Sequence, residues 1–159
     1  MLALRPLAES DWPEVARIYQ DGLDTGVASF ETDVPPWDEW DALMRPELRL
    51  VAESDGEVVG FVAIGSTSRR ACYRGVVEHS IYVAEAARGQ GVGRALLERL
   101  VAGASSHGVW TIQTSILPSN HASLALHSSV GFRTVGTRER IAERDNRWQD
   151  SILLELRLP

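Results

Sequence analysis

The sequence has only one cysteine, Cys72, so no disulfide bond can form within the chain. A chain without disulfides fits a reducing compartment. The sequence also lacks any run approaching the roughly 18 apolar residues that a membrane-spanning helix requires. Its N-terminal apolar run is too short for a signal peptide. Together these absences predict a cytoplasmic protein that does not associate with membranes.

An excess of basic residues is absent as well. The 16 basic and 22 acidic residues give a formal net charge of −6 and a pI near 5.2. Proteins that bind nucleic acids usually carry a basic surface, so we expect no nucleic-acid partner. An anionic ligand would need a local binding device, such as backbone amides and a few well-placed arginines.

The chain of 159 residues is long enough for one domain with its own hydrophobic core. No repeat, low-complexity tract or linker divides it, so residues 1–159 are predicted to form a single domain. Strand-like runs alternate with segments whose apolar residues recur at helical spacing. The expected strands are 2–5, 48–52, 58–64, 76–83, 109–116, 135–140 and 151–158, and the expected helices 11–22, 37–44, 91–104 and 120–130. This order favours an α/β fold with a single mixed, mostly antiparallel sheet flanked by helices.

A glycine-rich segment, Arg88-Gly-Gln-Gly-Val-Gly-Arg94, separates a predicted strand from a predicted amphipathic helix. Glycines let the backbone approach a ligand, and the free amides at a helix N-terminus bind anions. The segment lacks the Gly-Lys-Ser/Thr ending of a Walker loop. Arg94 also stands where a dinucleotide-binding loop has its third glycine. A different pyrophosphate ligand is therefore expected, and a turn without a ligand is the alternative.

Four further motifs accompany this segment. They are Ala28-Ser-Phe-Glu31, Arg70-x-x-Tyr-Arg74, Val77-Glu-His-Ser-Ile-Tyr-Val83 and Asn120-x-x-Ser-x-x-x-His127-x-x-x-Gly-Phe132. With the glycine-rich loop they resemble the GCN5-related N-acetyltransferases (GNAT) over almost the whole chain. The first three more narrowly resemble the phosphinothricin and methionine sulfoximine acetyltransferases. The resemblance implies a GNAT-like acyl-CoA N-acyltransferase fold and acetyl-CoA as the acetyl donor.

The resemblance also implies which residues bind acetyl-CoA. The strand before the loop would lend backbone groups to the pantetheine arm and the acetyl carbonyl, through Ile81, Tyr82 and Val83. The loop would bind the pyrophosphate through Arg88, Gly89, Gln90, Gly91, Val92, Gly93 and Arg94. Asn120 and Ser123 would contact the pantetheine or acetyl end. Asn120 is also a candidate helix N-cap, and the two roles are compatible.

Direct acetyl transfer needs a base for the amine, a polarised thioester carbonyl, and a proton or hydrogen bond for the departing thiolate. The resemblance assigns the base to Glu78, directly or through water, and its apolar sequence neighbours suggest a desolvated environment. The alternative for Glu78 is a strand carboxylate that faces solvent. His127 shares a helix face with Asn120 and Ser123 and is assigned the general acid, with a core histidine as the alternative. His79 lies on the opposite strand face from Glu78 and is expected to be structural.

Arg70, Tyr73 and Arg74 precede the strand that leads to the glycine-rich loop. Arginines suit carboxylate, phosphinate and sulfonyl oxygens, and a tyrosine can form a pocket wall. Phe30 and Glu31 lie in a loop that would cover this end. The resemblance implies that these five residues bind an amino acid analogue whose α-amine is acetylated. A solvated arginine patch is the alternative. The resemblance also implies a homodimer with the acceptor pocket near the partner subunit.

Two other functions compete with this hypothesis. The same fold could acetylate a protein or peptide amine, although an open acidic groove would suit such an acceptor better than a pocket with arginines. A module that binds coenzyme A without catalysis is the other alternative, against which the presence of Glu78 and His127 argues. No pair of histidines and acids has metal-ligand spacing, so we expect no metal. Cys72 has no neighbouring base in the sequence that would activate it as a nucleophile.

Overall fold

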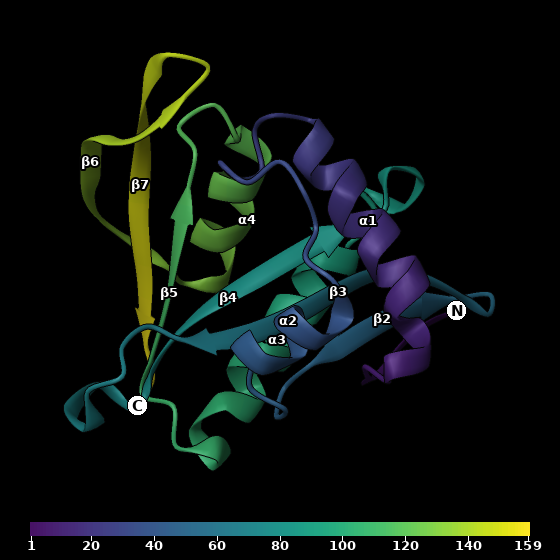
Figure 1. Cartoon of the computed structure of the whole chain (residues 1–159). Helices are drawn as coiled ribbons and strands as arrows, with labels where there is room; N and C mark the ends of the chain where they lie inside the picture. Colours follow the sequence, from purple (N-terminus) through teal and green to yellow (C-terminus); the bar gives the residue numbers. More distant parts are fainter.

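Residues 1–159 are all described by a computed structural model, in which seven strands form one sheet in the order β1-β2-β3-β4-β5-β7-β6 (Figure 1). Neighbouring strands are antiparallel except for β4 and β5, which are parallel. The predicted mixed, mostly antiparallel sheet is therefore confirmed. The strands are β1 (Leu2–Pro6), β2 (Leu50–Ser54), β3 (Glu57–Ser66), β4 (Val76–Val83), β5 (Thr111–Ile116), β6 (Arg133–Arg144) and β7 (Arg147–Arg157).

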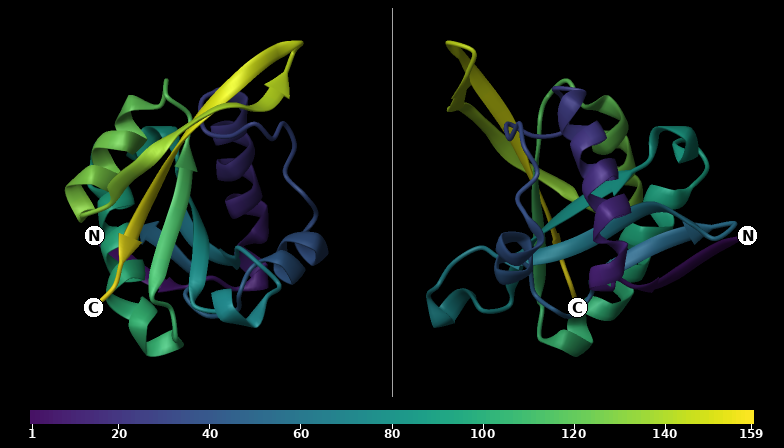
Figure 2. Two further views of the ribbon diagram at one scale, coloured as in Figure 1. Left: turned by 90° about the vertical axis from the view of Figure 1, so that its left-hand side faces the viewer. Right: turned by 45° about the vertical axis from the view of Figure 1, so that its right-hand side comes forward.

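Four α-helices cover the two faces of the sheet: α1 (Trp12–Asp24), α2 (Trp37–Leu43), α3 (Val92–Ala104) and α4 (His121–Val130). The left view of Figure 2 shows the sheet between α1 and α2 on one side and α3 and α4 on the other. Each side has its own buried cluster, one built on the leucines of α3 and the other on aromatic residues around Trp40 and Phe61. No helix is long and apolar enough to cross a membrane.

Strand β4 contributes side chains to both clusters, because successive residues of a strand point to opposite faces. Val77, Ile81 and Val83 pack in the cluster on the α3 side. Tyr82 packs in the cluster on the α1 side. Glu78 and Tyr82 therefore share one face of the sheet, whereas His79 lies on the other.

The parallel pairing of β4 with β5 ends early. The last paired residues are Glu78 and Gln113, although β4 continues to Val83 and β5 to Ile116. Figure 1 shows the two strands diverging beyond this point. The following residues of both strands, 79–83 and 114–116, have no strand partner across the gap. The divergence leaves a gap between β4 and β5, and the site described below lies at this gap.

Some element boundaries differ from the sequence expectation for physical reasons. The helix predicted to end at Gly22 continues to Asp24, and Gly22 permits a close contact, since a Cβ atom there would lie 2.4 Å from the Tyr82 ring. The last two strands are longer than predicted. Asp145 and Asn146 have φ values of 55° and 58° and form a tight turn, so the hairpin extends into solvent (Figure 2).

Candidate active site

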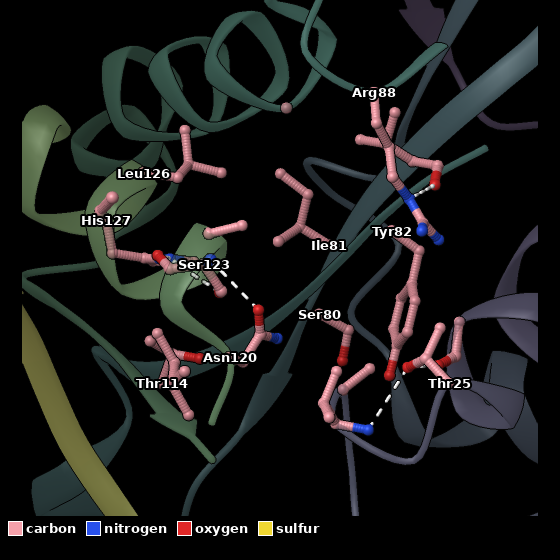
Figure 3. A pocket seen from close by; sticks show the side chains of 18 of the residues that line it. Thr25, Ser80, Ile81, Tyr82, Arg88, Thr114, Asn120, Ser123, Leu126 and His127 are labelled. Carbon is pink, nitrogen blue, oxygen red and sulfur yellow. Dashed lines mark hydrogen bonds between the residues drawn. The ribbon is translucent and has the colours of Figure 1, made fainter. Parts of the chain in front are cut away.

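A cavity of about 950 Å³ lies where β4 and β5 diverge. It is lined by the ends of both strands, the C-terminal part of α1 with the following loop, the first turns of α4, and the glycine-rich loop. Figure 3 shows that Ile81 and Tyr82 of β4 lie across the cavity from Asn120, Ser123 and His127. The cavity thus connects an apolar strand edge with two helix N-termini, an arrangement that suits an elongated ligand with an anionic end.

The glycine-rich loop forms one end of the cavity. Gly89 and Gly91 have φ values of +73° and +84°, a conformation that side-chain-bearing residues rarely adopt. A Cβ atom at either position would meet no protein atom within 4 Å, so the space beside both glycines is open. Gly91 is the N-cap of α3, a helix of 13 residues, so unpaired backbone amides gather here. This geometry fits a diphosphate group.

The residues predicted to bind acetyl-CoA line this cavity, with one exception. The side chain of Gln90 points away and donates a 2.9 Å hydrogen bond to the Ala86 carbonyl. The two arginines of the loop differ in their surroundings. Arg88 donates only a 3.3 Å bond to the Val83 carbonyl, whereas the Arg94 guanidinium is paired with Glu98 at 2.7 Å. Arg88 is therefore the cation more available to an anionic ligand.

Asn120 is the N-cap of α4. Its side-chain oxygen accepts a 3.2 Å hydrogen bond from the Ser123 backbone amide, as Figure 3 shows. Its side-chain nitrogen makes no hydrogen bond within the protein and lies at the cavity wall. The residue thus occupies the capping position while leaving a donor for a ligand, so the two roles considered from the sequence are compatible here.

Glu78 lies at the last paired position of β4, at the entrance to the gap, and its side chain lines the cavity. The residue is exposed, and its carboxylate has no hydrogen bond or ion pair within the protein. The desolvated environment expected from its apolar sequence neighbours is thus absent. Those neighbours point to the other face of the sheet, because Val77 and His79 alternate with Glu78 along the strand.

His127 is almost completely buried, with 1% of its surface exposed. Its Nδ1 atom lies 2.7 Å from the Ser123 carbonyl oxygen, and its Nε2 atom lies 2.8 Å from Nε2 of His79. Both ring nitrogens therefore face protein groups. The ring does not present an N–H to the cavity, and the direct proton donation that its sequence position predicts does not follow from this geometry.

His79 is the partner that sequence reasoning treated as structural. It is 4% exposed and packs with His127 and Phe132 on the α4 side of β4. Burial lowers the pKa of both imidazoles, and the neighbouring His127 lowers that of His79 further. The Gln113 backbone raises the pKa of His79 and the Ser123 backbone raises that of His127, both to a smaller extent than burial lowers them. Nδ1 of His79 makes no hydrogen bond within the protein. Both rings are therefore neutral near pH 7.

Aromatic side chains form the cavity wall on the α1 side. The Tyr82 ring lies 4.7 Å from that of Tyr19 and 5.6 Å from that of Phe61, measured between centroids. Burial raises the pKa of both tyrosines, and the Glu31 carboxylate raises both further. Glu31 therefore acts on this side electrostatically, although neither Phe30 nor Glu31 lines the cavity.

The loop after α1 supplies Val27, Ala28 and Ser29 to the cavity wall. Arg144, at the end of β6, donates hydrogen bonds of 2.9 Å and 3.0 Å to the carbonyls of Gly26 and Ser29. The hairpin of β6 and β7 thereby holds the loop in place. Sequence reasoning missed this contact, because the two segments are more than 110 residues apart and no local pattern links them.

Arg70, Tyr73 and Arg74 lie elsewhere. They are exposed residues in and beside the short helix η2 (Ala71–Tyr73), before β4, whereas the glycine-rich loop follows β4. The Arg70 guanidinium lies 5.4 Å from the Tyr73 ring and that of Arg74 lies 5.3 Å from the Trp110 ring. Neither arginine has an acidic partner. Within one chain, the structure does not bring these three residues together with the cavity.

The fold and the cavity combine a glycine-rich loop at a helix N-terminus, whose geometry fits a diphosphate group, with a carboxylate at a gap between strands, as a transferase with a diphosphate-containing donor would need. Residues 6–132 match the profile of the acetyltransferase (GNAT) family. The chain therefore belongs to the GNAT family and is an N-acetyltransferase.

Relatives and solved structures agree with this membership. The chain is 36% identical to the phosphinothricin N-acetyltransferase of Alcaligenes faecalis, over 96% of this chain and 80% of that protein. It is 31% identical to the L-methionine sulfoximine/L-methionine sulfone acetyltransferase of Pseudomonas paraeruginosa, over 98% and 94%. The phosphinothricin acetyltransferase of Sinorhizobium meliloti in complex with acetyl-CoA superposes with a TM-score of 0.88 at 28% identity, over 99% of this chain and 88% of that one.

Proposed function

We propose that the protein transfers an acetyl group from acetyl-CoA to the α-amine of a small amino acid analogue. The acceptor class is that of methionine sulfoximine, methionine sulfone and phosphinothricin. The observation that carries the proposal is one continuous cavity that joins the glycine-rich loop to the exposed carboxylate of Glu78. The names of the relatives support the acceptor class.

The chain's own groups account for binding of the donor. The amides around Gly89 and Gly91 and the Arg88 guanidinium would hold the diphosphate of acetyl-CoA. The unpaired edge of β4 at residues 79–83 would hydrogen-bond the amides of the pantetheine arm, as a neighbouring strand would. The thioester would then lie near the point where β4 and β5 separate, which is the position of Glu78.

Glu78 would act as the general base that takes the proton from the acceptor amine. A carboxylate without a protein partner is free to accept this proton, directly or through water. On the same face, the tyrosine wall and the loop held by Arg144 would enclose the acceptor side chain. We further propose a cytoplasmic homodimer in which Arg70, Tyr73 and Arg74 act near the subunit boundary, since their side chains are exposed and have no acidic partner.

Acetylation of a protein amine remains the second candidate. It is favoured by a structural neighbour named ribosomal-protein-alanine N-acetyltransferase from Brucella melitensis, with a TM-score of 0.88 and 32% identity over 98% of this chain and 99% of that one. The two candidates differ in the size of acceptor that the cavity must admit.

An acceptor panel tests the proposal. Methionine sulfoximine, methionine sulfone, phosphinothricin and a peptide with a free N-terminal alanine would be incubated with acetyl-CoA, and the released thiol measured. We expect the small analogues to give kcat/KM values at least about tenfold above that of the peptide, because the tyrosine wall and the loop held by Arg144 would enclose only a small acceptor. Equal or faster turnover of the peptide would refute the proposed acceptor class.

A further inference from the structure

A chain of three hydrogen-bonding groups runs from the core to the cavity. His79 on β4 contacts His127 on α4, and His127 contacts both the carbonyl and the hydroxyl of Ser123 one turn earlier. The two imidazoles are buried, whereas Ser123 lines the cavity beside Asn120 (Figure 3). The direction in which each group donates decides what Ser123 can offer to a ligand.

The positions of the protons follow from the partners. A carbonyl oxygen can only accept, so the 2.7 Å contact to the Ser123 carbonyl requires a proton on Nδ1 of His127. Nε2 of this neutral ring is then an acceptor. The 2.8 Å contact between the two Nε2 atoms accordingly requires His79 to donate. Nδ1 of His79 then carries no proton, and it has no hydrogen-bond partner within the protein.

This proton arrangement frees the hydroxyl of Ser123. Its oxygen lies 3.3 Å from Nδ1 of His127, but that nitrogen already carries a proton and cannot accept one. The hydroxyl makes no other hydrogen bond within the protein, so its hydrogen can be directed into the cavity. With the opposite tautomer of His127, Nδ1 would accept the hydroxyl hydrogen and turn it away.

We propose that Ser123 is a catalytic residue whose hydroxyl donates a hydrogen bond to the departing thiolate, and that His79 and His127 are positioning residues that keep this donor free. In the transfer, the C–N bond forms and the C–S bond breaks. The amine proton passes to Glu78 and the electron pair to sulfur, while Ser123 keeps its proton. The inference rests on the acetyl transfer proposed above, and on no particular acceptor.

The location of the three residues agrees with this role. His79 is the first residue of β4 beyond the last pair with β5, and it directly follows Glu78. Ser123 faces the same gap from the first turn of α4. No carboxylate or cation contributes to the pKa of either imidazole; burial, the partner ring and two backbone groups are the causes.

The kinetics of four variants test the proposed chain of hydrogen bonds. We expect Ser123→Ala to lower kcat by roughly 10–100-fold with little change in either KM, as for the loss of a donor used in the transition state. His79→Phe should lower kcat by about tenfold, because His127 loses the donor that fixes its tautomer. His79→Gln, which retains an N–H donor, should stay within about threefold of wild type. His107→Gln, at an exposed site outside the cavity, is the matched control.

The double variant separates positioning from a merely structural role. If His79 acts through Ser123, adding His79→Phe to Ser123→Ala should cause little further loss, whereas independent roles would multiply the two losses. The melting temperature of His79→Phe should fall by only a few degrees at pH 7, because the variant removes the unpaired Nδ1 of His79 but leaves Nε2 of His127 without a donor. Multiplying losses, or full activity of Ser123→Ala, would overturn the proposal.

Nitrogen NMR of the imidazoles gives a readout without turnover or acetyl-CoA. In the wild-type protein at pH 7 we expect a proton on Nε2 of His79 and on Nδ1 of His127. Tautomers of the opposite kind would overturn the proposed hydrogen-bond chain even if the acetyltransferase activity holds. The expected tautomers together with a protein inactive on every amine would instead contradict the proposed function.

Discussion

Replacement of Gly91 by alanine isolates the role of the glycine-rich loop. Gly91 has a φ of +84°, and a Cβ atom there meets nothing within 4 Å. The change therefore causes no clash inside the protein, but it places alanine in a left-handed conformation that costs roughly 1–2 kcal/mol. A change of 1 kcal/mol shifts the melting temperature of a domain of this size by about 2–4 °C. We expect the melting temperature to fall by roughly 2–8 °C.

The chain contains a matched control for this strain. Gly56, in the turn between β2 and β3, has the same φ of +84° and the same open surroundings, but it lies outside the cavity. Gly56→Ala should therefore lose a similar amount of stability. If Gly91→Ala also weakens acetyl-CoA binding, the cause must be contact with the ligand. The new methyl group would occupy space beside the amides at the N-terminus of α3.

Calorimetric titration with acetyl-CoA distinguishes the two variants. We expect Gly91→Ala to raise the Kd by about tenfold or more, equivalent to about 1.4 kcal/mol, and Gly56→Ala to leave it unchanged. A valine at position 91 should weaken binding further. Equal affinities for Gly91→Ala and Gly56→Ala would refute the assignment of the loop to the diphosphate.

Two other predictions concern the loop after α1 and the buried imidazoles. Arg144→Ala removes the bonds to the Gly26 and Ser29 carbonyls and should raise the acceptor KM by several-fold to tenfold without changing that of acetyl-CoA. Arg138→Ala, at an exposed position of the same strand, should change neither KM. Equal effects of both variants would show that the bonds from Arg144 do not hold the loop for the acceptor. The lowered pKa of His79 means that the unfolded chain binds protons below about pH 6.5 while the folded chain does not, so the unfolding free energy falls as the pH falls. In urea unfolding, the free energy of unfolding of His79→Phe should therefore fall by about 2 kcal/mol less than that of wild type between pH 7 and pH 5. Identical decreases would show that His79 is not buried as a neutral ring.

The sequence was informative wherever the determinant was local. The Asp55-Gly56 pair is typical of the tight turn that joins β2 and β3, and both residues have positive φ values. The glycine-rich loop predicted the start of α3 one residue early. Alternation along 76–83 placed Glu78 and His79 on opposite faces of the strand, as the structure has them. Short-range geometry was therefore sufficient for the strands, the glycine-rich loop and the face of β4 on which Glu78 lies.

The remaining features depend on contacts between distant segments. His79 was considered structural because it lies on the strand face opposite Glu78, and no local pattern shows that His127 lies 2.8 Å away from it. Gly22 was interpreted as a helix end, whereas it makes room for the Tyr82 ring within the helix. Arg74 was assigned to the acceptor site on motif alone, and no local pattern shows that its side chain packs over Trp110. In each case the partner is supplied by another element of the fold.

The pH dependence of turnover by Glu78→Gln tests the central claim most directly. Glutamine keeps the shape of the side chain but cannot accept the amine proton, and general base catalysis is typically worth about 10²–10⁴-fold. With methionine sulfone and acetyl-CoA, we expect a loss of that order in kcat at pH 7 with acetyl-CoA affinity retained. The deficit should shrink at high pH, where solution supplies the free amine. A variant within twofold of wild type at pH 7 would contradict the assignment of Glu78 as the base at the gap between β4 and β5.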